Sequence, residues 1–392
     1  MDISFQTGTL LLVIAAVVAM LTKRLRLPYS AGLVAAGVCL AALPFAPTVT
    51  LTKDFLFTVL LPPLLFDSAF HIHWDRLRRN ALVIGLLATV GVVLSASVTA
   101  MGMHYVAHWQ WIGALVFGAL IAATDPVSVI ATFKEAGAHG RLLVLLEAES
   151  LFNDGTAAVA FGVVAALAEG LQLTPAHIAV MLAQTIGGGV LCGAAVGAGS
   201  LLLMGRTDDH LVEITFTTVA AYGSFLLADH FGLSGVLATI TAGLVMRNFT
   251  SLEGITQRGR EAIQTFWEYA AFVATSMVFL LIGIQQSHHN FLAVWLPTAI
   301  AIAFVLLGRG AAVYGVCLAF SRSSLRVSAK HQHLLFWGGL RGALALALAL
   351  GLPAQMPLRE EIIAVSFGVV AFTIFVQGLT MTPLLRKMGE IA

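Results

Sequence analysis

Charged residues are scarce in this sequence. Only 10% of its 392 residues are Asp, Glu, Lys or Arg, whereas 59% are hydrophobic. So few polar side chains cannot coat a soluble domain of this size, which excludes a soluble globular protein and indicates an integral membrane protein. The formal net charge is +1 and no basic run contains interleaved aromatic residues, so nothing indicates a nucleic-acid partner.

Cysteine is also rare, and the three cysteines all lie inside apolar stretches: Cys39, Cys192 and Cys317. They form neither a disulfide framework nor a CxxC metal site, so we expect packing roles and no cofactor. No basic residue precedes the first apolar run, which predicts an anchored helix rather than a cleavable signal peptide. No hydrophilic domain flanks the apolar runs, and we expect no cytoplasmic regulatory domain.

Long apolar runs, by contrast, fill the chain. The predicted spans cover residues 8–22, 29–46, 54–70, 81–103, 110–133, 142–168, 176–204, 211–229, 233–249, 264–284, 291–320, 333–351 and 362–385. Runs of this kind are typical of helices that cross the hydrocarbon core of a bilayer. The sequence therefore predicts an all-α polytopic membrane protein with about 13 transmembrane helices.

The basic residues orient these spans. If the loop at residues 22–28 is cytoplasmic, the alternate loops hold all of the 21 Lys and Arg residues except Lys53, Arg359 and two within spans, Arg309 and Arg341. Because cytoplasmic loops are enriched in Lys and Arg, this asymmetry predicts an N-terminus outside and a C-terminus in the cytoplasm. We expect a bacterial-type inner membrane.

Internal symmetry indicates a transporter. Residues 30–37 resemble residues 234–243, seven spans later, as an inverted repeat requires. Pro126 falls within the fifth predicted span, and three glycines cluster in the twelfth, again seven spans apart: Gly338, Gly339 and Gly342. Interrupted spans at corresponding positions are typical of the binding site of a transporter.

The sequence EAESLFNDGT places several acids within the sixth predicted span. Each ionisable group near a bilayer centre costs roughly 2.5–3.5 kcal/mol, so a functional site is favoured. On a helix, Glu147, Ser150 and Asp154 share one stripe, Glu149 lies on another face, and Asn153 lies between them. We therefore expect Ser150 and Asp154 to face one neighbouring span and Glu149 to face a different one.

The fifth span carries a second carboxylate. Proline supplies no N–H, so Pro126 should free backbone carbonyls around Ala122 to Thr124, beside the Asp125 carboxylate, where they could bind a cation. A proline kink satisfied by a hydroxyl is the alternative, but it leaves Asp125 unexplained. Asp67, nine residues before the basic loop at Arg76, is a candidate third carboxylate; it could instead be an acid near the cytoplasmic mouth.

These oxygen groups suit a small hard cation, because no thiol or histidine lies among them. Burial and mutual repulsion favour a protonated carboxyl, so Asp154 or Asp125 could take up a proton whenever the metal ion leaves. A site that holds either ion, but not both together, gives exchange by competition.

Two arginines within spans need counter-charges. We expect Arg341 to pair with Glu149, an ion pair that fixes the twelfth span against the sixth. Arg309 has no identified partner, and its long aliphatic side chain could let the guanidinium reach the membrane–water interface. Glu147 either lines an entrance or sits in a wet funnel.

The motifs also resemble a known family. They are LPPLLFDSAF at Leu61, ATDPVSV at Ala122, LLEAESLFNDGTA at Leu145, SGVLATITAGL at Ser234 and WGGLRGALALALAL at Trp337. Together they resemble the monovalent cation/proton antiporter family of the sodium/proton exchanger type, over nearly the whole chain. The resemblance implies a thirteen-helix inverted repeat in which the fifth and twelfth helices are unwound and cross.

The same resemblance implies a domain organisation and a homodimer. Residues 1–80 and 205–289 would form mainly dimerisation and scaffold helices. Residues 81–170 and 290–386 would form a mobile ion-binding core, and residues 171–204 a linker helix. Na⁺ or another monovalent cation and H⁺ would be the substrates, with the lipid bilayer as surroundings.

Site roles follow from the resemblance position by position. It implies that Asp154 is the ion and proton carboxylate, with Asp125, Ser150 and the Thr124 main chain as co-ligands. Asn153 corresponds to an asparagine that goes with electroneutral one-for-one exchange. Glu149 and Arg341 match the structural ion pair of the family. One departure is Asp67, where the family pattern usually has Glu. The shorter carboxylate could reach the ion only through water.

Three alternatives stay open. An antiporter that prefers K⁺ would have the same motifs, because cavity size sets that choice. A cation channel needs a continuous hydrated path, which an apolar frame around one neutralisable site disfavours. Gly232-Leu-Ser234-Gly235 matches a rhomboid-like serine protease motif, but it lies at an outer span end and no intramembrane histidine follows it. We expect a transporter and not an enzyme.

Overall fold

The computed structural model describes residues 5–25, 27–43, 52–125, 130, 140–168, 170–171, 174–207, 209–249, 257–286 and 293–390. Every regular element in these ranges is helical. The chain divides into two units. The first unit comprises Met1–Lys53, Asn80–Glu169 and Ser276–Ala392, and the second comprises Asp54–Arg79 and Gly170–Thr275.

The first unit holds most of the C-terminal half. Its elements are α1 (Phe5–Leu25), α2 (Tyr29–Ala41), η2 (Leu87–Gly91), α6 (Val92–Tyr105), α7 (Trp111–Leu120), α9 (Arg141–Ala168), α15 (Trp295–Ala319), α16 (Ala329–Trp337), α17 (Ala343–Leu350), α18 (Arg359–Phe372), η4 (Thr373–Gly378) and α19 (Leu379–Lys387). The segments named η are π-helical turns that continue a neighbouring α-helix.

The second unit is built from fewer elements. They are η1 (Leu56–Leu60), α4 (Leu61–His71), α10 (Pro175–Met204), α11 (His210–Thr218), η3 (Val219–Gly223), α12 (Ser224–His230) and α13 (Gly235–Phe249). Three helices have residues in both units: α3 (Lys53–Phe55), α5 (Trp74–Leu86) and α14 (Gln257–Gln286).

Within the described residues, eight helices are long and apolar enough to cross a membrane. They are Gln6–Leu25, Trp74–Tyr105, Arg141–Ala168, Pro175–Met204, His210–His230, Gln257–Gln285, Trp295–Ala319 and Arg359–Lys387. Shorter apolar helices are Tyr29–Ala41, Trp111–Leu120 and Gly235–Phe249. The prediction of a multi-span, all-α membrane protein is therefore confirmed, whereas the figure of 13 spans stays a prediction.

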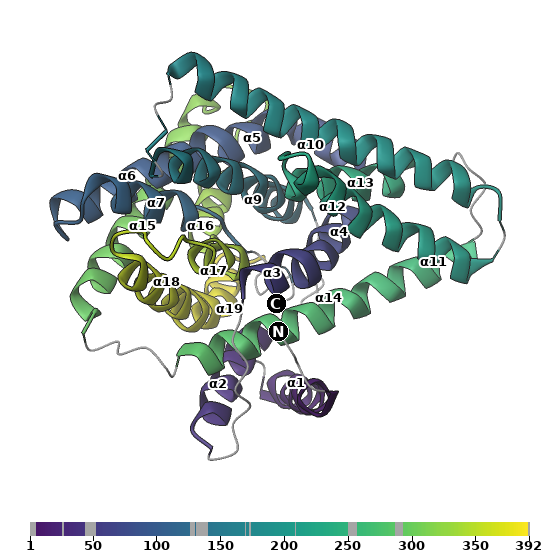
Figure 1. Cartoon of the computed structure of the whole chain (residues 1–392), viewed down its shortest axis with the longest axis horizontal. Helices are drawn as coiled ribbons and strands as arrows, with labels where there is room; N and C mark the ends of the chain where they lie inside the picture. The colour runs from purple at the N-terminus through teal and green to yellow at the C-terminus, as the bar shows by residue number, and fades with distance from the viewer. Residues whose placement is uncertain are drawn as a thin grey trace. The chain divides into compact units, whose positions relative to one another are not determined.

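Small residues let helices approach closely in the second unit, where α10 and α13 run side by side (Figure 1). Gly189, Gly193 and Gly197 recur every fourth residue on α10. A Cβ atom on Gly193 would collide with the backbone of Ala238, and one on Gly197 would lie 3.0 Å from the Cα of Ala242. Such spacing is typical of membrane helices, where packing rather than hydrophobicity joins neighbours.

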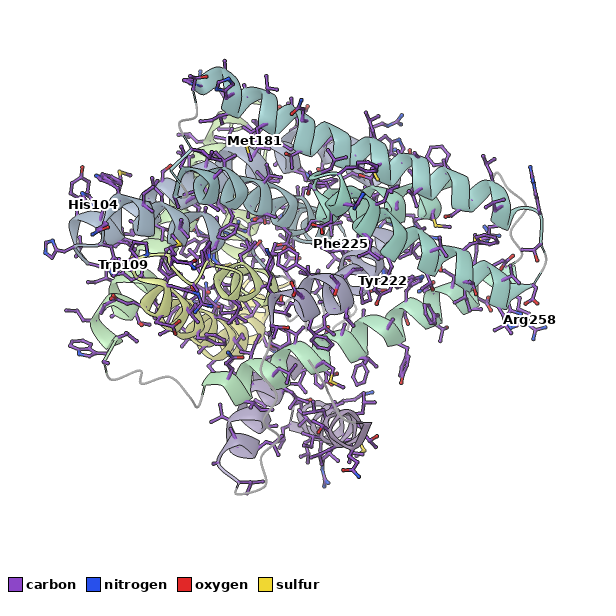
Figure 2. The ribbon with its side chains drawn as sticks, in the orientation of Figure 1. His104, Trp109, Met181, Tyr222, Phe225 and Arg258 are labelled. Carbon is purple, nitrogen blue, oxygen red and sulfur yellow. The ribbon has the colours of Figure 1, made fainter. Side chains whose placement is uncertain are left out.

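In the first unit, the turn between α6 and α7 is fixed by aromatic residues. His104 and Trp109, labelled in Figure 2, lie at the end of α6 and in this turn, and His104 Nδ1 is 2.8 Å from the Trp109 carbonyl oxygen. The Trp109 indole N–H donates to Glu361 of α18 over 3.1 Å. The start of α7 is therefore tied to α18.

Two predicted spans are interrupted in the first unit. The twelfth is divided into α16 and α17, and the non-helical residues between them include the predicted glycine cluster. In the fifth, α7 ends at Leu120 and the chain is non-helical through Asp125. Pro126 and Ser128 lie outside the described residues. The crossing of two unwound helices stays a prediction.

Candidate functional site

The two non-helical segments of the first unit lie against each other. The backbone N–H of Asp125 donates to the carbonyl of Leu340 over 2.7 Å. A Cβ atom on Gly342 would collide with the Asp125 carboxylate, so a residue without a side chain is needed at this close approach. The glycine cluster therefore both ends α16 and admits Asp125 beside the break.

Arg341 satisfies the backbone that α7 leaves exposed. Its side chain is 1% exposed, and its guanidinium donates to the carbonyl oxygens of Ala122 and Ala123, the latter over 3.2 Å. Its own N–H donates to the Thr373 hydroxyl of η4 over 3.1 Å. The carbonyls that we expected to be free for a cation at Ala122 and Ala123 therefore already accept hydrogen bonds from a buried cation.

Glu149 pairs with Arg309 of α15. The two guanidinium nitrogens of Arg309 lie 2.7 and 3.0 Å from the two carboxylate oxygens, and one of them also donates to the Leu335 carbonyl over 2.8 Å. Both side chains are buried. The bidentate geometry is the strong form of such a pair.

The predicted pairing of Glu149 with Arg341 is therefore wrong. The guanidinium of Arg341 is occupied by the carbonyls at the end of α7, and Arg309 reaches Glu149 along a path that Gly339 leaves open. A Cβ atom on Gly339 would collide with the Arg309 guanidinium. The sequence did show that Arg309 was a second arginine within a predicted span and needed a counter-charge, but it did not show which of the two arginines faces Glu149.

Ser150 and Asn153 connect α9 to the non-helical segment after α7. The Ser150 hydroxyl donates to the Thr124 carbonyl, and the Thr124 hydroxyl lies 3.2 Å from Ser150 Oγ. The Asn153 side-chain amide donates to the Thr124 hydroxyl and to Glu149 Oε1, each over 3.2 Å. Asn153 is thus a hydrogen-bonded bridge between the Thr124 segment and the Glu149–Arg309 ion pair.

Asp154 is the acid that this network leaves unsatisfied. Its Oδ1 atom is buried and accepts no hydrogen bond within the part of the chain that the structure describes, and the same is true of Asn153 Oδ1. Two further acids belong to the same network, because Asp125 follows Thr124, which is hydrogen-bonded to Asn153, and Glu149 accepts a hydrogen bond from Asn153. Buried oxygens normally have a partner, and an anion placed beside other anions favours uptake of a cation or a proton.

Two further predicted site residues, Asp67 and Glu147, have no assigned role in this cluster. Asp67 belongs to the second unit, on α4, where its Oδ1 atom lies 3.5 Å from His71 Nδ1. Its role as a third carboxylate stays a prediction. Glu147 is buried on α9, and its role also stays open.

Ser234 has a structural explanation. Its Oγ atom accepts the N–H of Leu237 over 3.2 Å in the first turn of α13. Its own N–H donates to the Thr185 carbonyl of α10 over 3.1 Å. A serine at this position is a common helix cap, and these bonds account for it without a nucleophilic role.

Comparison with known proteins adds independent findings. The family model described as sodium/hydrogen exchanger, transmembrane, matches residues 11–387. The chain is 39% identical over 368 residues to the Na(+)/H(+) antiporter ApNhaP of Aphanothece halophytica, and 38% identical over 380 residues to the low-affinity Na(+)/H(+) antiporter NhaS1 of Synechocystis sp.. Each alignment covers 93% of this chain and 70% of the relative.

A solved structure has a similar fold. It is the sodium proton antiporter MjNhaP1 from Methanocaldococcus jannaschii, with a TM-score of 0.74 and 20% sequence identity. The alignment covers 98% of this chain and 96% of that one.

Proposed function

The chain belongs to the sodium/hydrogen exchanger family, whose members are integral membrane transporters and not enzymes, and from this premise we propose that it exchanges Na⁺ or Li⁺ for H⁺ by alternating access. The observation that carries the proposal is the buried Asp154 oxygen, which has no hydrogen-bond donor among the described residues and belongs to a helix whose Asn153 is bonded to Glu149 and to Thr124, the neighbour of Asp125. Among the described residues, no thiol or imidazole takes part in the hydrogen bonds of Ser150 and Asn153 on the same helix, and oxygen groups of this kind suit a small hard cation.

Competition for Asp154 would couple the two flows. With the cation bound, the repulsion between Asp154 and Asp125 is offset; without it, a proton on one carboxyl removes the same repulsion. An empty, doubly charged site would be costly to carry through the apolar frame, so only loaded forms would change the side to which they open. One cation and one proton then move in opposite directions.

The co-ligands would come from the segment after α7. The Thr124 carbonyl and the Ser150 hydroxyl already contact each other, and each oxygen keeps a further lone pair for the ion. Asp67 would contribute at most through water. The carbonyls of Ala122 and Ala123 would instead hold Arg341 and thereby keep the segment in place.

The remaining organisation belongs to the same proposal. Residues 81–170 and 290–386 would move as the ion-binding core against scaffold helices from residues 1–80 and 205–289, joined by the linker at 171–204. The protein would act as a homodimer in the cell membrane, with its N-terminus outside and its C-terminus in the cytoplasm. The basic loops support this orientation.

The purified chain in vesicles tests the function. With an acidic lumen imposed, adding external Na⁺ or Li⁺ is expected to dissipate the pH gradient, whereas an equal concentration of K⁺ has little effect. Measuring all three ions across pH gives both the activity and the ion preference. A response to K⁺ that exceeds the response to Na⁺ would replace the proposal by K⁺/H⁺ antiport, and no response to any of them would reject it.

Asn153 leads to a prediction about charge. A neutral amide at this position leaves one fewer negative charge than an aspartate would, so we expect one Na⁺ per H⁺ and an electroneutral cycle. The membrane potential of the vesicles is clamped with valinomycin and K⁺, and the Na⁺/H⁺ exchange rate should be the same at 0 mV as at an imposed potential. A rate that varies steeply with the potential would contradict one-for-one exchange.

A further inference from the structure

A groove of about 500 Å³ opens on the first unit, and its lining residues belong to α15, α16 and α19 or directly follow α19. None of its lining residues belongs to the exchange site. Its wall is largely aromatic and apolar, and includes Tyr314, Phe336, Trp337, Leu384 and Lys387.

The polar atoms of the wall are paired with one another. The Tyr314 hydroxyl lies 2.7 Å from His333 Nδ1, and the Trp337 indole N–H donates to the Thr380 hydroxyl over 2.9 Å. The rings of Tyr314 and Phe336 are 5.7 Å apart. Because these polar tips are satisfied, the wall offers mainly carbon surface to an occupant, as a hydrocarbon chain requires.

The lining of the groove includes a positive charge, Lys387. Lys387 is the last residue of α19, is exposed, and makes no ion pair or hydrogen bond within residues 293–390 or the other described ranges. Lys330, at the start of α16, differs because it pairs with Glu390 over 2.8 Å, and Glu390 also lies 3.3 Å from His331. Among the residues that line the groove, Lys387 is therefore the lysine available to an anionic group.

Two of the helices that line the groove, and the π-helical turn before α19, also expose apolar side chains. Leu318 of α15 is 72% exposed, and Val376 and Leu379 of η4 and α19 are 40% and 39% exposed. In a membrane-spanning chain, such side chains face hydrocarbon. Tyrosine and tryptophan are enriched where hydrocarbon meets head groups, and the groove has both beside its lysine.

We propose that this groove binds one anionic phospholipid, with an acyl chain along the aromatic wall and the phosphate at Lys387. Pockets of this kind between transmembrane helices, basic at the membrane surface, are typical of sites for anionic head groups. The lipid contacts α15, α16 and α19 together. Because α16 ends at the break beside Asp125, the bound lipid holds one half of the interrupted span in place, whichever ion is transported.

Trp337 provides a direct probe of occupancy. The full chain in uncharged detergent micelles is titrated with phosphatidylglycerol that carries brominated acyl chains, and quenching by bromine is recorded for the unmodified chain and for Trp337→Phe. The difference between the two signals reports lipid at the groove. Phosphatidylglycerol is expected to quench this difference signal at a lower mole fraction than brominated phosphatidylcholine.

A matched pair of charge variants separates the site from general attraction. Lys387→Ala is expected to weaken the phosphatidylglycerol response about fivefold, the contribution of one cation near an anionic surface. Arg322→Ala removes one positive charge from an exposed position just after α15 that does not line the groove, and should leave the response unchanged. Equal responses to the two lipids, or equal effects of the two variants, would overturn the proposal.

Inorganic phosphate distinguishes a lipid site from a simple anion site. Inorganic phosphate in excess over the lipid should not displace brominated phosphatidylglycerol, because burial of the acyl chain contributes much of the binding free energy. Complete displacement would instead identify a phosphate site and reject the lipid. These measurements do not depend on transport, so a failure of the lipid proposal and a failure of Na⁺/H⁺ exchange are recognised separately.

Discussion

Replacing Asp154 with Asn is expected to reduce sodium-dependent proton movement to the rate of protein-free vesicles, without lowering the melting temperature. The amide keeps the size of the side chain but can neither hold a negative charge nor take up and release a proton. Since Asp154 Oδ1 accepts no hydrogen bond in the described residues, the substitution removes no internal bond of that atom. The loss should therefore be functional rather than structural.

Asp229→Asn is the matched control for this change. Asp229 is exposed in the last turn of α12, so the same chemical substitution there should leave both transport and melting temperature unchanged. Transport by Asp154→Asn at a normal rate would reject the mechanism. Loss of transport together with a lower melting temperature would place Asp154 in the scaffold instead.

Competition between ion and proton has a further signature in the unmodified chain. If one proton excludes one Na⁺, the apparent KM for Na⁺ rises as the pH falls, by about tenfold per pH unit once the carboxyl titrates. The maximal rate at saturating Na⁺ changes much less over the same range. A KM that does not vary with pH would indicate that the proton is carried by a group other than the cation site.

The all-helical, multi-span fold could be predicted because the bilayer imposes a simple rule: long apolar runs must become helices that satisfy their own backbone. The break between α16 and α17 was also predictable, because three glycines within five residues weaken a helix and allow close approach. What the sequence did not reveal is that Gly342 accommodates Asp125 and that Gly339 accommodates Arg309.

The partner of Glu149 could not be predicted for a related reason. Counting residues from a basic loop estimates only the depth of a side chain along its helix. Arg309 and Arg341 both lie deep within spans, so depth did not separate them. The choice depends on which helices lie side by side and on which acceptors each guanidinium meets, and Arg341 meets the carbonyls at the end of α7.

The contacts of Asn153 show the same limit. Helical phase placed it between the Asp154 stripe and the Glu149 face, and its amide indeed contacts Glu149 Oε1. The hydrogen bond to the Thr124 hydroxyl depends on a non-helical segment whose course the sequence did not specify. Helical periodicity predicts the direction in which a side chain leaves its own helix. The contacts of that side chain depend also on the course of the neighbouring backbone.

Glu149→Leu is expected to lower the free energy of unfolding by about 3–5 kcal/mol, since it leaves the Arg309 guanidinium buried without its carboxylate. Arg309→Met alone should cost a similar amount. The double variant should recover much of the loss, because two apolar side chains remove the unpaired charge. Thermal melting of the four proteins in one detergent gives the coupling free energy directly.

A second double-mutant cycle, which combines Glu149→Leu with Arg341→Met, tests which of the two arginines pairs with Glu149. Arg341→Met releases the carbonyls of Ala122 and Ala123 and should be strongly destabilising, but its coupling to Glu149→Leu should be weak, because the groups make no direct contact. Direct contact predicts strong coupling for Glu149 with Arg309 and little for Glu149 with Arg341. The reverse order would restore the pairing of Glu149 with Arg341 that we predicted from the sequence and would mean that Arg341, not Arg309, holds the interrupted span against α9.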